Sequence, residues 1–368
     1  MKKSRIFSLL LVGLLLAAFP LQGAAEDFVF TPDPGVIDMT KTRPRSEIVI
    51  RDPFVLVYGQ KYFLYGTGIS QGEGYGCYVS EDMENWAGPV NIFTATPEFP
   101  GVWEFWAPEC HYYNGMFYLF GTYFSRDTQH RGVSIFRSDN PLGPFEEITD
   151  GHITPPDWDS IDGTLYIDPD GQPWMVFVHE WTSMPDHIGD FSIAKLSADF
   201  THFISKPTQL FRASEIPGRL NGNIVTDGCW LVRSRKGELL MLWSGYGKND
   251  EYCVVTAKST SGSIEGPWQQ FPHPLYERRG SFEFDGGHGM IFTALDGKQY
   301  LSIHSPNRAE VGAPRPLFLE ITEKDGRFVL KQELDETLSF KQTVTKFFSF
   351  MLDGLIAILR GIAGIFTK

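Results

Sequence analysis

The sequence predicts an all-β fold, a five-bladed β-propeller with an amphipathic helix appended at its C-terminus. Residues Ser160–Trp181 form a hairpin pattern: a small or polar residue, an apolar strand, a glycine-containing turn and an aromatic-rich strand. This pattern recurs along the chain, and repeats of about 50 residues that are built from short strands are typical of propellers. The five copies begin at Asp52, Ala107, Asp162, Asp227 and His288.

The turn of each copy has the chemistry that a tight hairpin requires. The third copy turns at Asp168-Pro169-Asp170-Gly171, where proline presets φ and glycine supplies a positive φ. The second turns at Asn114-Gly115, a two-residue hairpin signal. A β-sandwich of hairpins is the alternative fold. The other three turns are Tyr58-Gly59-Gln60, Arg235-Lys236-Gly237 and Asp296-Gly297.

The chain begins with the features of a secretory signal peptide. Basic residues within Met1–Arg5 precede the apolar run Ile6–Ala18, and Gly23-Ala24-Ala25 offers a small-residue cleavage site. We therefore expect residues 1–25 to be removed and the mature protein to be exported to the periplasm, the cell surface or the medium. An N-terminal membrane anchor is the alternative, although the apolar run is short for spanning a bilayer.

The predicted propeller occupies residues 26–338. Four hairpins are followed by a further strand that ends in serine, and the last blade closes with Arg315–Glu320 and Arg327–Leu330. These segments supply the outer strands of the blades. The four serine-ended strands are Cys77–Ser80, Ser134–Ser138, Ser192–Ser197 and Val254–Ser259.

Residues 339–368 have a different pattern. Apolar side chains recur at helical spacing from Val344 to Phe366, and Asp353 and Arg360 interrupt them. Two charges within the span argue against a simple transmembrane helix. We expect a helix that lies on a membrane surface or associates with a second copy. Packing of this helix against the propeller stays open as a further alternative.

Composition restricts the class of partner. The net charge is −13 and no basic stripe is present, so nucleic acid is not an expected partner, whereas neutral ligands suit this surface. The four cysteines lack the spacing of a zinc site. Export permits a disulfide, and burial as free thiols is the alternative. The cysteines are Cys77, Cys110, Cys229 and Cys253.

Propeller symmetry predicts that the first residues of the five copies gather at one mouth of the central channel. Asp52, Asp162, Asp227 and His288 would then lie close together, which is costly because like charges raise one another's pKa. Such a cluster indicates a functional site. Paired carboxylates suit glycoside hydrolysis, in which one acts as acid and the other as base. The alternative is that the aspartates only cap strands and turns.

Candidate substrate-binding residues lie near these positions. Trp103 and Trp106 precede Ala107, and Trp181 follows the third hairpin in a longer connection. Their rings would serve as platforms for sugars. Phe105, in contrast, is expected in the core. Arg315 is a candidate for a polar contact with the substrate.

Four short motifs mark the repeats: Arg51-Asp52-Pro53, Trp106-Ala107-Pro108-Glu109, Ile161-Asp162 and Gly287-His288-Gly289. Together they resemble glycoside hydrolase family 43 over about Ile48 to Leu330. The resemblance implies an inverting five-bladed propeller that acts on α-L-arabinofuranosyl or β-D-xylosyl linkages, without an organic cofactor. It implies Asp52 as general base and Asp162 as the carboxyl group that tunes pKa values and orients the donor. It also implies His288 on the axis, helping to hold a calcium ion or its water.

The chain departs from the family pattern at the general acid. The family has a glutamate at the start of the fourth inner strand, where this chain has Asp227-Gly228-Cys229. Aspartate is one methylene shorter, so its reach to the leaving oxygen is in question. Glu215 and Glu180 are the other candidates for the acid.

The sequence therefore predicts an exported, inverting glycosidase that acts on pentose-containing plant polysaccharides or oligosaccharides. One alternative is a carbohydrate-binding propeller without catalysis. The other is a fructan hydrolase of the invertase-like families, which share the RDP motif and a Glu-Cys pair like Glu109-Cys110. The chain lacks the WMNDPNG-like nucleophile motif of those families.

Overall fold

The computed structural model describes residues 28–218, 222–333, 340–341 and 344. The predicted signal peptide lies outside the described residues, as does nearly all of the predicted C-terminal helix. Within the described part of the chain, no helix is long and apolar enough to span a membrane.

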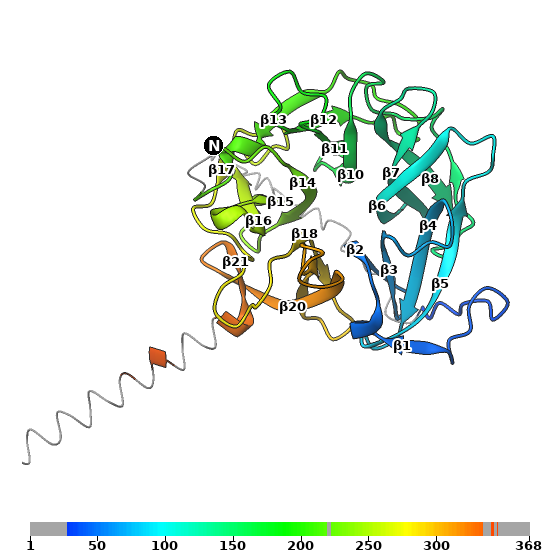
Figure 1. Ribbon diagram of the computed structural model, residues 1–368, viewed down its shortest axis with the longest axis horizontal. Coiled ribbons are helices and arrows are strands. Elements are labelled where there is room, and N and C mark those ends of the chain that lie inside the picture. The colour runs from blue at the N-terminus through cyan, green and yellow to red at the C-terminus, as the bar shows by residue number, and fades with distance from the viewer. Residues whose placement is uncertain (1–27, 219–221, 334–339, 342–343, 345–368) are drawn as a thin grey trace, which may run out of the picture.

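The structure confirms the predicted five-bladed propeller. Five separate antiparallel sheets stand around a central axis (Figure 1). Blade 1 contains β1 (Thr42–Pro44), β2 (Arg51–Tyr58), β3 (Lys61–Thr67), β4 (Gly74–Ser80) and β5 (Asn85–Thr94). Blade 2 contains β6 (Gly101–Tyr113), β7 (Met116–Ser125), β8 (Arg131–Ser138) and β9 (Glu146–Glu147). Blade 3 contains β10 (Ser160–Ile167), β11 (Pro173–His179), β12 (Asp190–Lys195) and β13 (Thr208–Arg212).

The last two blades follow the same plan. Blade 4 contains β14 (Asp227–Arg233), β15 (Leu239–Tyr246), β16 (Tyr252–Ser259) and β17 (Trp268–Gln270). Blade 5 contains β18 (Gly287–Thr293), β19 (Gln299–Ser305), β20 (Arg315–Lys324) and β21 (Arg327–Leu330). Three short 3₁₀ helices connect elements: η1 (Arg45–Glu47), η2 (Ala213–Glu215) and η3 (Lys248–Asp250).

The blades pack face to face through large apolar side chains. The aromatic-rich second strands supply much of this core, and Trp243, Phe63 and Phe177 are fully buried. Burying side chains of this size stabilises the fold by about 1.5–3 kcal/mol each. The four cysteines are buried free thiols, which decides the question that the sequence left open.

Each sheet is a continuous stretch of chain, so no strand from one end of the chain joins the blade at the other end. Hydrogen bonds between blades 5 and 1 close the ring instead. Ser302 Oγ donates to Pro53 O at 2.7 Å, and the Leu295 N–H donates to Tyr62 Oη at 2.9 Å. Arg51 Nη2 donates to Asn307 Oδ1 at 2.7 Å. These bonds fix β2, the strand that carries Asp52, and its neighbour β3 against the last blade.

Candidate active site

Every innermost strand has a register shift close to its start, which is the mark of a β-bulge. The bulged residue has a positive φ in all five blades. The bulge therefore changes the direction of this side chain, which no longer follows the regular alternation of side chains between the two faces of the sheet. The five residues and their φ values are Asp52 (53°), Ala107 (41°), Asp162 (56°), Gly228 (39°) and His288 (54°).

The fourth blade corrects one expectation from the sequence. Gly228, and not Asp227, occupies the position equivalent to Asp52, Asp162 and His288. The physical reason is space, because a Cβ on Gly228 would lie 2.6 Å from Cδ2 of His288. Asp227 therefore approaches the cluster from the preceding backbone position.

A ring of bonds between blades holds the bulges. A hydroxyl or imidazole on the second strand of one blade accepts the backbone N–H of the bulged residue in the next blade. Thr67 Oγ1 accepts the Ala107 N–H at 2.7 Å, and Thr122 Oγ1 accepts the Asp162 N–H at 3.1 Å. The other two such bonds run from the His288 N–H to Ser244 Oγ (2.8 Å) and from the Asp52 N–H to His304 Nδ1 (3.2 Å). In the fourth blade the Gly228 N–H donates to Asp162 Oδ2 at 2.8 Å.

The side chains of three bulged residues meet, as the sequence predicted. His288 Nδ1 lies 3.2 Å from Asp52 Oδ1 and 3.8 Å from Asp162 Oδ2. Thr67 Oγ1 donates to Asp52 Oδ2 at 2.6 Å. Asp162 and His288 are buried, so their charges interact with little screening.

The two aspartates are shifted in opposite directions. Burial alone would raise the pKa of Asp52, but the nearby His288, His304 and Arg51, with the Thr67 hydroxyl, hold its pKa below the ordinary value. Burial raises the pKa of Asp162 to about 7, and the neighbouring carboxylates reinforce this shift against the His288 charge. Burial disfavours the charged imidazole of His288, but the surrounding carboxylates, that of Asp52 most strongly, outweigh burial and raise the pKa of His288. The cluster thus contains one ionised and one protonated aspartate at mildly acidic pH.

Asp227 belongs to the same cluster. Tyr252 Oη donates to Asp227 Oδ2 at 2.9 Å. Burial raises the pKa of Asp227, against the His288 charge and the Tyr252 hydroxyl. Its carboxyl group also acts on the pKa of Asp162, so the two titrate as a pair.

Glu180 lies just beyond the end of β11, and it is 9 % exposed. Its Oε2 lies 3.1 Å from Nε of Arg131, and Arg131 also contacts Glu104 and the ring of Trp106. Burial raises the pKa of Glu180 to about 8, opposed by Arg131 and reinforced by Asp227. At neutral pH Glu180 is therefore a further carboxyl group that is largely protonated.

Glu215 is placed differently. It ends η2, which follows the outermost strand of blade 3, and its side chain is exposed. Its Oε1 accepts the backbone N–H of Arg212 at 3.1 Å, which caps the short helix. Among the described residues, no hydrogen bond or ion pair joins Glu215 to Asp52, Asp162 or Asp227.

The predicted substrate-binding residues differ in how they are presented. Trp103 is 51 % exposed, and its ring stacks on Phe124 at 4.9 Å with an interplanar angle of 16°. Trp181 is 36 % exposed, whereas the Arg131 guanidinium lies over the Trp106 ring at 5.4 Å. Arg315 Nη1 is buried and has no hydrogen-bond partner among the described residues, which leaves a donor for a ligand.

The cavity below the cluster is narrow, with a volume of about 10 Å³. Asp52, Glu109, Gly228 and His288 line it together with apolar side chains. Calcium takes six to eight oxygen ligands. Within the described ranges no group of three or more His, Cys, Asp and Glu side chains is arranged to hold a metal ion. The axial calcium at His288 stays a prediction, and no step below depends on it.

Sequence reasoning missed the residues that support the cluster. Thr67, His304 and Tyr252 each bond to one of its aspartates. A signal for Thr67 and Thr122 was available, because the second strands of the first two hairpins contain the similar tripeptides Tyr65-Gly66-Thr67 and Phe120-Gly121-Thr122.

Comparisons with known proteins agree with this geometry. The model of glycosyl hydrolases family 43 matches residues 42–326. The chain is 25 % identical over 304 residues to an extracellular exo-α-(1→5)-L-arabinofuranosidase of Cellvibrio japonicus, covering 72 % of this chain and 81 % of that protein. It is 27 % identical over 152 residues to an extracellular endo-α-(1→5)-L-arabinanase of Bacillus subtilis, covering 38 % and 46 %.

Solved structures show the same similarity. A crystal structure of an endo-arabinase from Bacteroides thetaiotaomicron superimposes with a TM-score of 0.70 at 36 % identity, covering 78 % of this chain and 99 % of that one. An endo-1,4-β-xylanase from the same organism gives a TM-score of 0.67 at 27 % identity, covering 79 % and 96 %.

Proposed function

The chain belongs to glycosyl hydrolases family 43 and is a glycoside hydrolase, and from this premise we propose that it cleaves α-(1→5)-linked L-arabinofuranosyl chains with inversion at the anomeric carbon. The names of the relatives from Cellvibrio and Bacillus support this linkage, and the Bacteroides structure is named as an endo-arabinase. The observation that carries the mechanism is the opposite protonation of carboxyl groups within one cluster. A β-1,4-xylan is the second candidate substrate, favoured by the similar xylanase structure.

Asp52 is assigned as the general base. Its low pKa keeps it ionised, and Thr67 Oγ1 fixes one oxygen at 2.6 Å while the other faces His288. A water molecule gives its proton to Asp52 as its oxygen attacks the anomeric carbon. In the same step the glycosidic C–O bond breaks, and the leaving oxygen takes a proton from the general acid.

Asp227 is assigned as that general acid. Its raised pKa supplies the proton, and the Tyr252 hydroxyl fixes the carboxyl group. Burial and the nearby carboxylate of Asp52 favour the protonated form of Asp227, whose titration is coupled to that of Asp162, and the Gly228 N–H positions Asp162. Glu180 is the rival donor, because it is also buried and carries a raised pKa.

Leaving-group dependence distinguishes the two donors. A variant without its general acid hydrolyses aryl glycosides with acidic phenols far better than glycosides with basic leaving groups. We expect Asp227→Asn to show this steep dependence, and Glu180→Gln to keep the wild-type slope. The opposite result would transfer the role of acid to Glu180.

The exposed aromatics are assigned to the sugar chain. Trp103 presents one face to solvent while its other face rests on Phe124, so little entropy is lost when a ring stacks on it. Trp181 lies next to Glu180 at the end of β11 and would contact a neighbouring sugar. Arg315 would donate through its unpaired Nη1 to a hydroxyl. The assignment of export rests on the signal-like N-terminus and on the extracellular relatives.

Hydrolysis assays test the proposal. We expect release of nitrophenol from 4-nitrophenyl α-L-arabinofuranoside and release of sugar from linear arabinan. Asp52→Asn should reduce kcat/KM by about 10²–10⁴-fold with an unchanged melting temperature. Sugar binding without hydrolysis of any pentose-containing substrate would instead identify a binding propeller.

A further inference from the structure

A second cavity lies between blades 4 and 5, at the opposite end of the propeller from Asp52 and His288. Its volume is about 190 Å³. The turns that border it, at Glu238 and at Asp325-Gly326, follow strands β14 and β20, which run away from the active-site mouth. A ligand held there would not contact the catalytic carboxyl groups.

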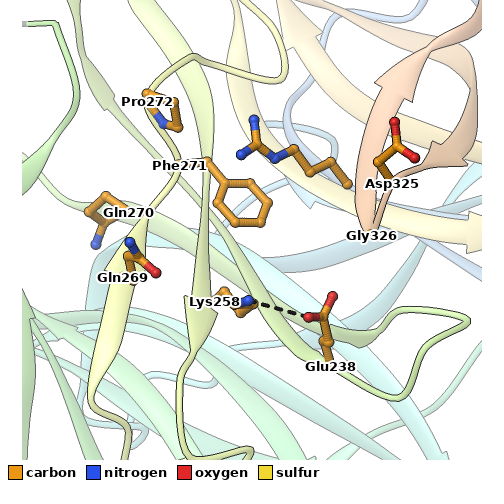
Figure 2. Close-up of a pocket in the computed structure, with 9 residues that line it drawn as sticks. Glu238, Lys258, Gln269, Gln270, Phe271, Pro272, Asp325 and Gly326 are labelled. Atoms are coloured by element: carbon orange, nitrogen blue, oxygen red, sulfur yellow. Dashed lines mark hydrogen bonds and ion pairs between the residues drawn. The ribbon is translucent and has the colours of Figure 1, made fainter.

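The polar side chains of this cavity are held in place before any ligand arrives. Lys258 Nζ lies 3.2 Å from Glu238 Oε1 (Figure 2). The Arg327 guanidinium lies over the Phe271 ring at 4.8 Å. Gly326 has a φ of +78°, and a Cβ there would lie 2.7 Å from Glu238 Oε2. The glycine thus allows the β20–β21 turn to approach Glu238 closely.

The charges of the lining are balanced. Lys258 and Arg327 contribute two cations, Glu238 and Asp325 contribute two carboxylates, and Gln269 adds an amide. Donors and acceptors therefore surround the same space, which suits the hydroxyl groups of a neutral sugar. A polyanion is disfavoured because the chain has a net charge of −13. The volume is below the ~300 Å³ of a typical drug-sized pocket, so it accommodates a short stretch of sugar chain.

We propose that this inter-blade cavity is a second glycan-binding site, which holds a distant part of the same neutral arabinan chain that is cleaved at the mouth. The identity of the glycan rests on the function proposed above. Two sites on one molecule keep a polymer near the enzyme between cleavages, because the second binding event is intramolecular. A short substrate cannot reach both ends of the propeller. The site therefore affects polymers and leaves small glycosides unaffected.

Affinity electrophoresis in gels that contain linear arabinan tests the site. The Asp52→Asn background prevents digestion of the polymer, and the double change Gln269→Ala with Asp325→Ala removes exposed groups of the cavity. We expect the gel to retard the parent, and the retardation constant to fall at least threefold in the double variant. The matched control is Gln172→Ala with Asp170→Ala at the blade 3 hairpin, which should leave retardation unchanged.

Activity measurements in the otherwise wild-type protein separate the two proposals. The double variant should keep kcat/KM for the aryl arabinofuranoside within twofold and lose at least threefold on arabinan. Equal retardation of the double variant and its parent would overturn the second site, even with full aryl activity. Loss of retardation in a protein that hydrolyses no arabinofuranoside would support the second site and refute the proposed function.

Discussion

Replacing Gly228 with alanine places a methyl group against the imidazole of His288. The added Cβ would lie 2.6–2.8 Å from Cδ2, Cγ and Nε2 of the ring. Favourable contacts between carbon atoms begin near 3.5 Å, so the ring must retreat by about 0.8 Å. The positive φ of 39° costs an alanine about 1–2 kcal/mol of stability, as in the control below, but Ala107 adopts a φ of 41° at the equivalent position, so the backbone can keep its conformation.

The retreat acts on Asp52. His288 Nδ1 lies 3.2 Å from Asp52 Oδ1, and a shift of this size takes the pair out of hydrogen-bond distance. A hydrogen bond to a charged group contributes about 1.5–3 kcal/mol, which corresponds to a loss of about 10- to 150-fold in kcat/KM. Because His288 lowers the pKa of Asp52, its displacement also moves the acid limb of the pH profile to higher pH.

The assay is kcat/KM for 4-nitrophenyl α-L-arabinofuranoside across pH, together with thermal unfolding. Gly171→Ala is the matched control, because Gly171 has a φ of +83° and no atom within 4 Å of an added Cβ. We expect the control to lose about 1–2 kcal/mol of stability and to keep wild-type activity. Wild-type kcat/KM and an unshifted acid limb in Gly228→Ala would refute the reasoning.

Three further predictions concern the same cluster. In the wild type, kcat/KM should fall as pH rises above about 7, since the pKa of Asp162 is raised to about 7 and Asp227 titrates with it. Asp162→Asn should move this basic limb of the pH profile to lower pH, and an unmoved limb would contradict the coupling. Thr67→Val removes a hydroxyl that bonds to both Asp52 and the Ala107 N–H, so the free energy of unfolding should fall by about 1–3 kcal/mol and kcat/KM should also fall. Thr67→Ser, which keeps the hydroxyl, should restore both quantities. Glu215→Gln should keep kcat/KM within twofold, because the Glu215 carboxylate caps its own 3₁₀ helix; a loss beyond tenfold would return Glu215 to the candidate acids.

The sequence was sufficient to predict the blades and most of their alignment. Alternating apolar strands, glycine turns and a recurring hairpin depend on local chemistry, which one sequence displays directly. The meeting of Asp52, Asp162 and His288 followed from the repeat alone. The predicted equivalence of Asp227 to Asp52 was wrong by one residue. The bulge is defined by backbone φ, and Gly228 occupies it in the fourth blade without a side chain that would mark the position in the sequence.

The general acid shows where sequence reasoning ends. Glu215 and Glu180 are both glutamates in connections that follow strands of blade 3, and their residue type does not distinguish them. The fold places Glu180 directly after β11, the second strand of blade 3, next to Arg131. Glu215 instead follows β13, the outermost strand of that blade. Only the order of strands within the blade separates a buried carboxyl group from an exposed cap.

The central claim is that Asp52 activates a water molecule for a single displacement, and the configuration of the first product tests it most directly. Proton NMR during hydrolysis of an α-L-arabinofuranoside resolves the anomers before mutarotation. Inversion predicts that β-L-arabinofuranose appears first. Initial release of the α-anomer would require a covalent intermediate on a carboxylate, and would contradict the role of Asp52 as general base.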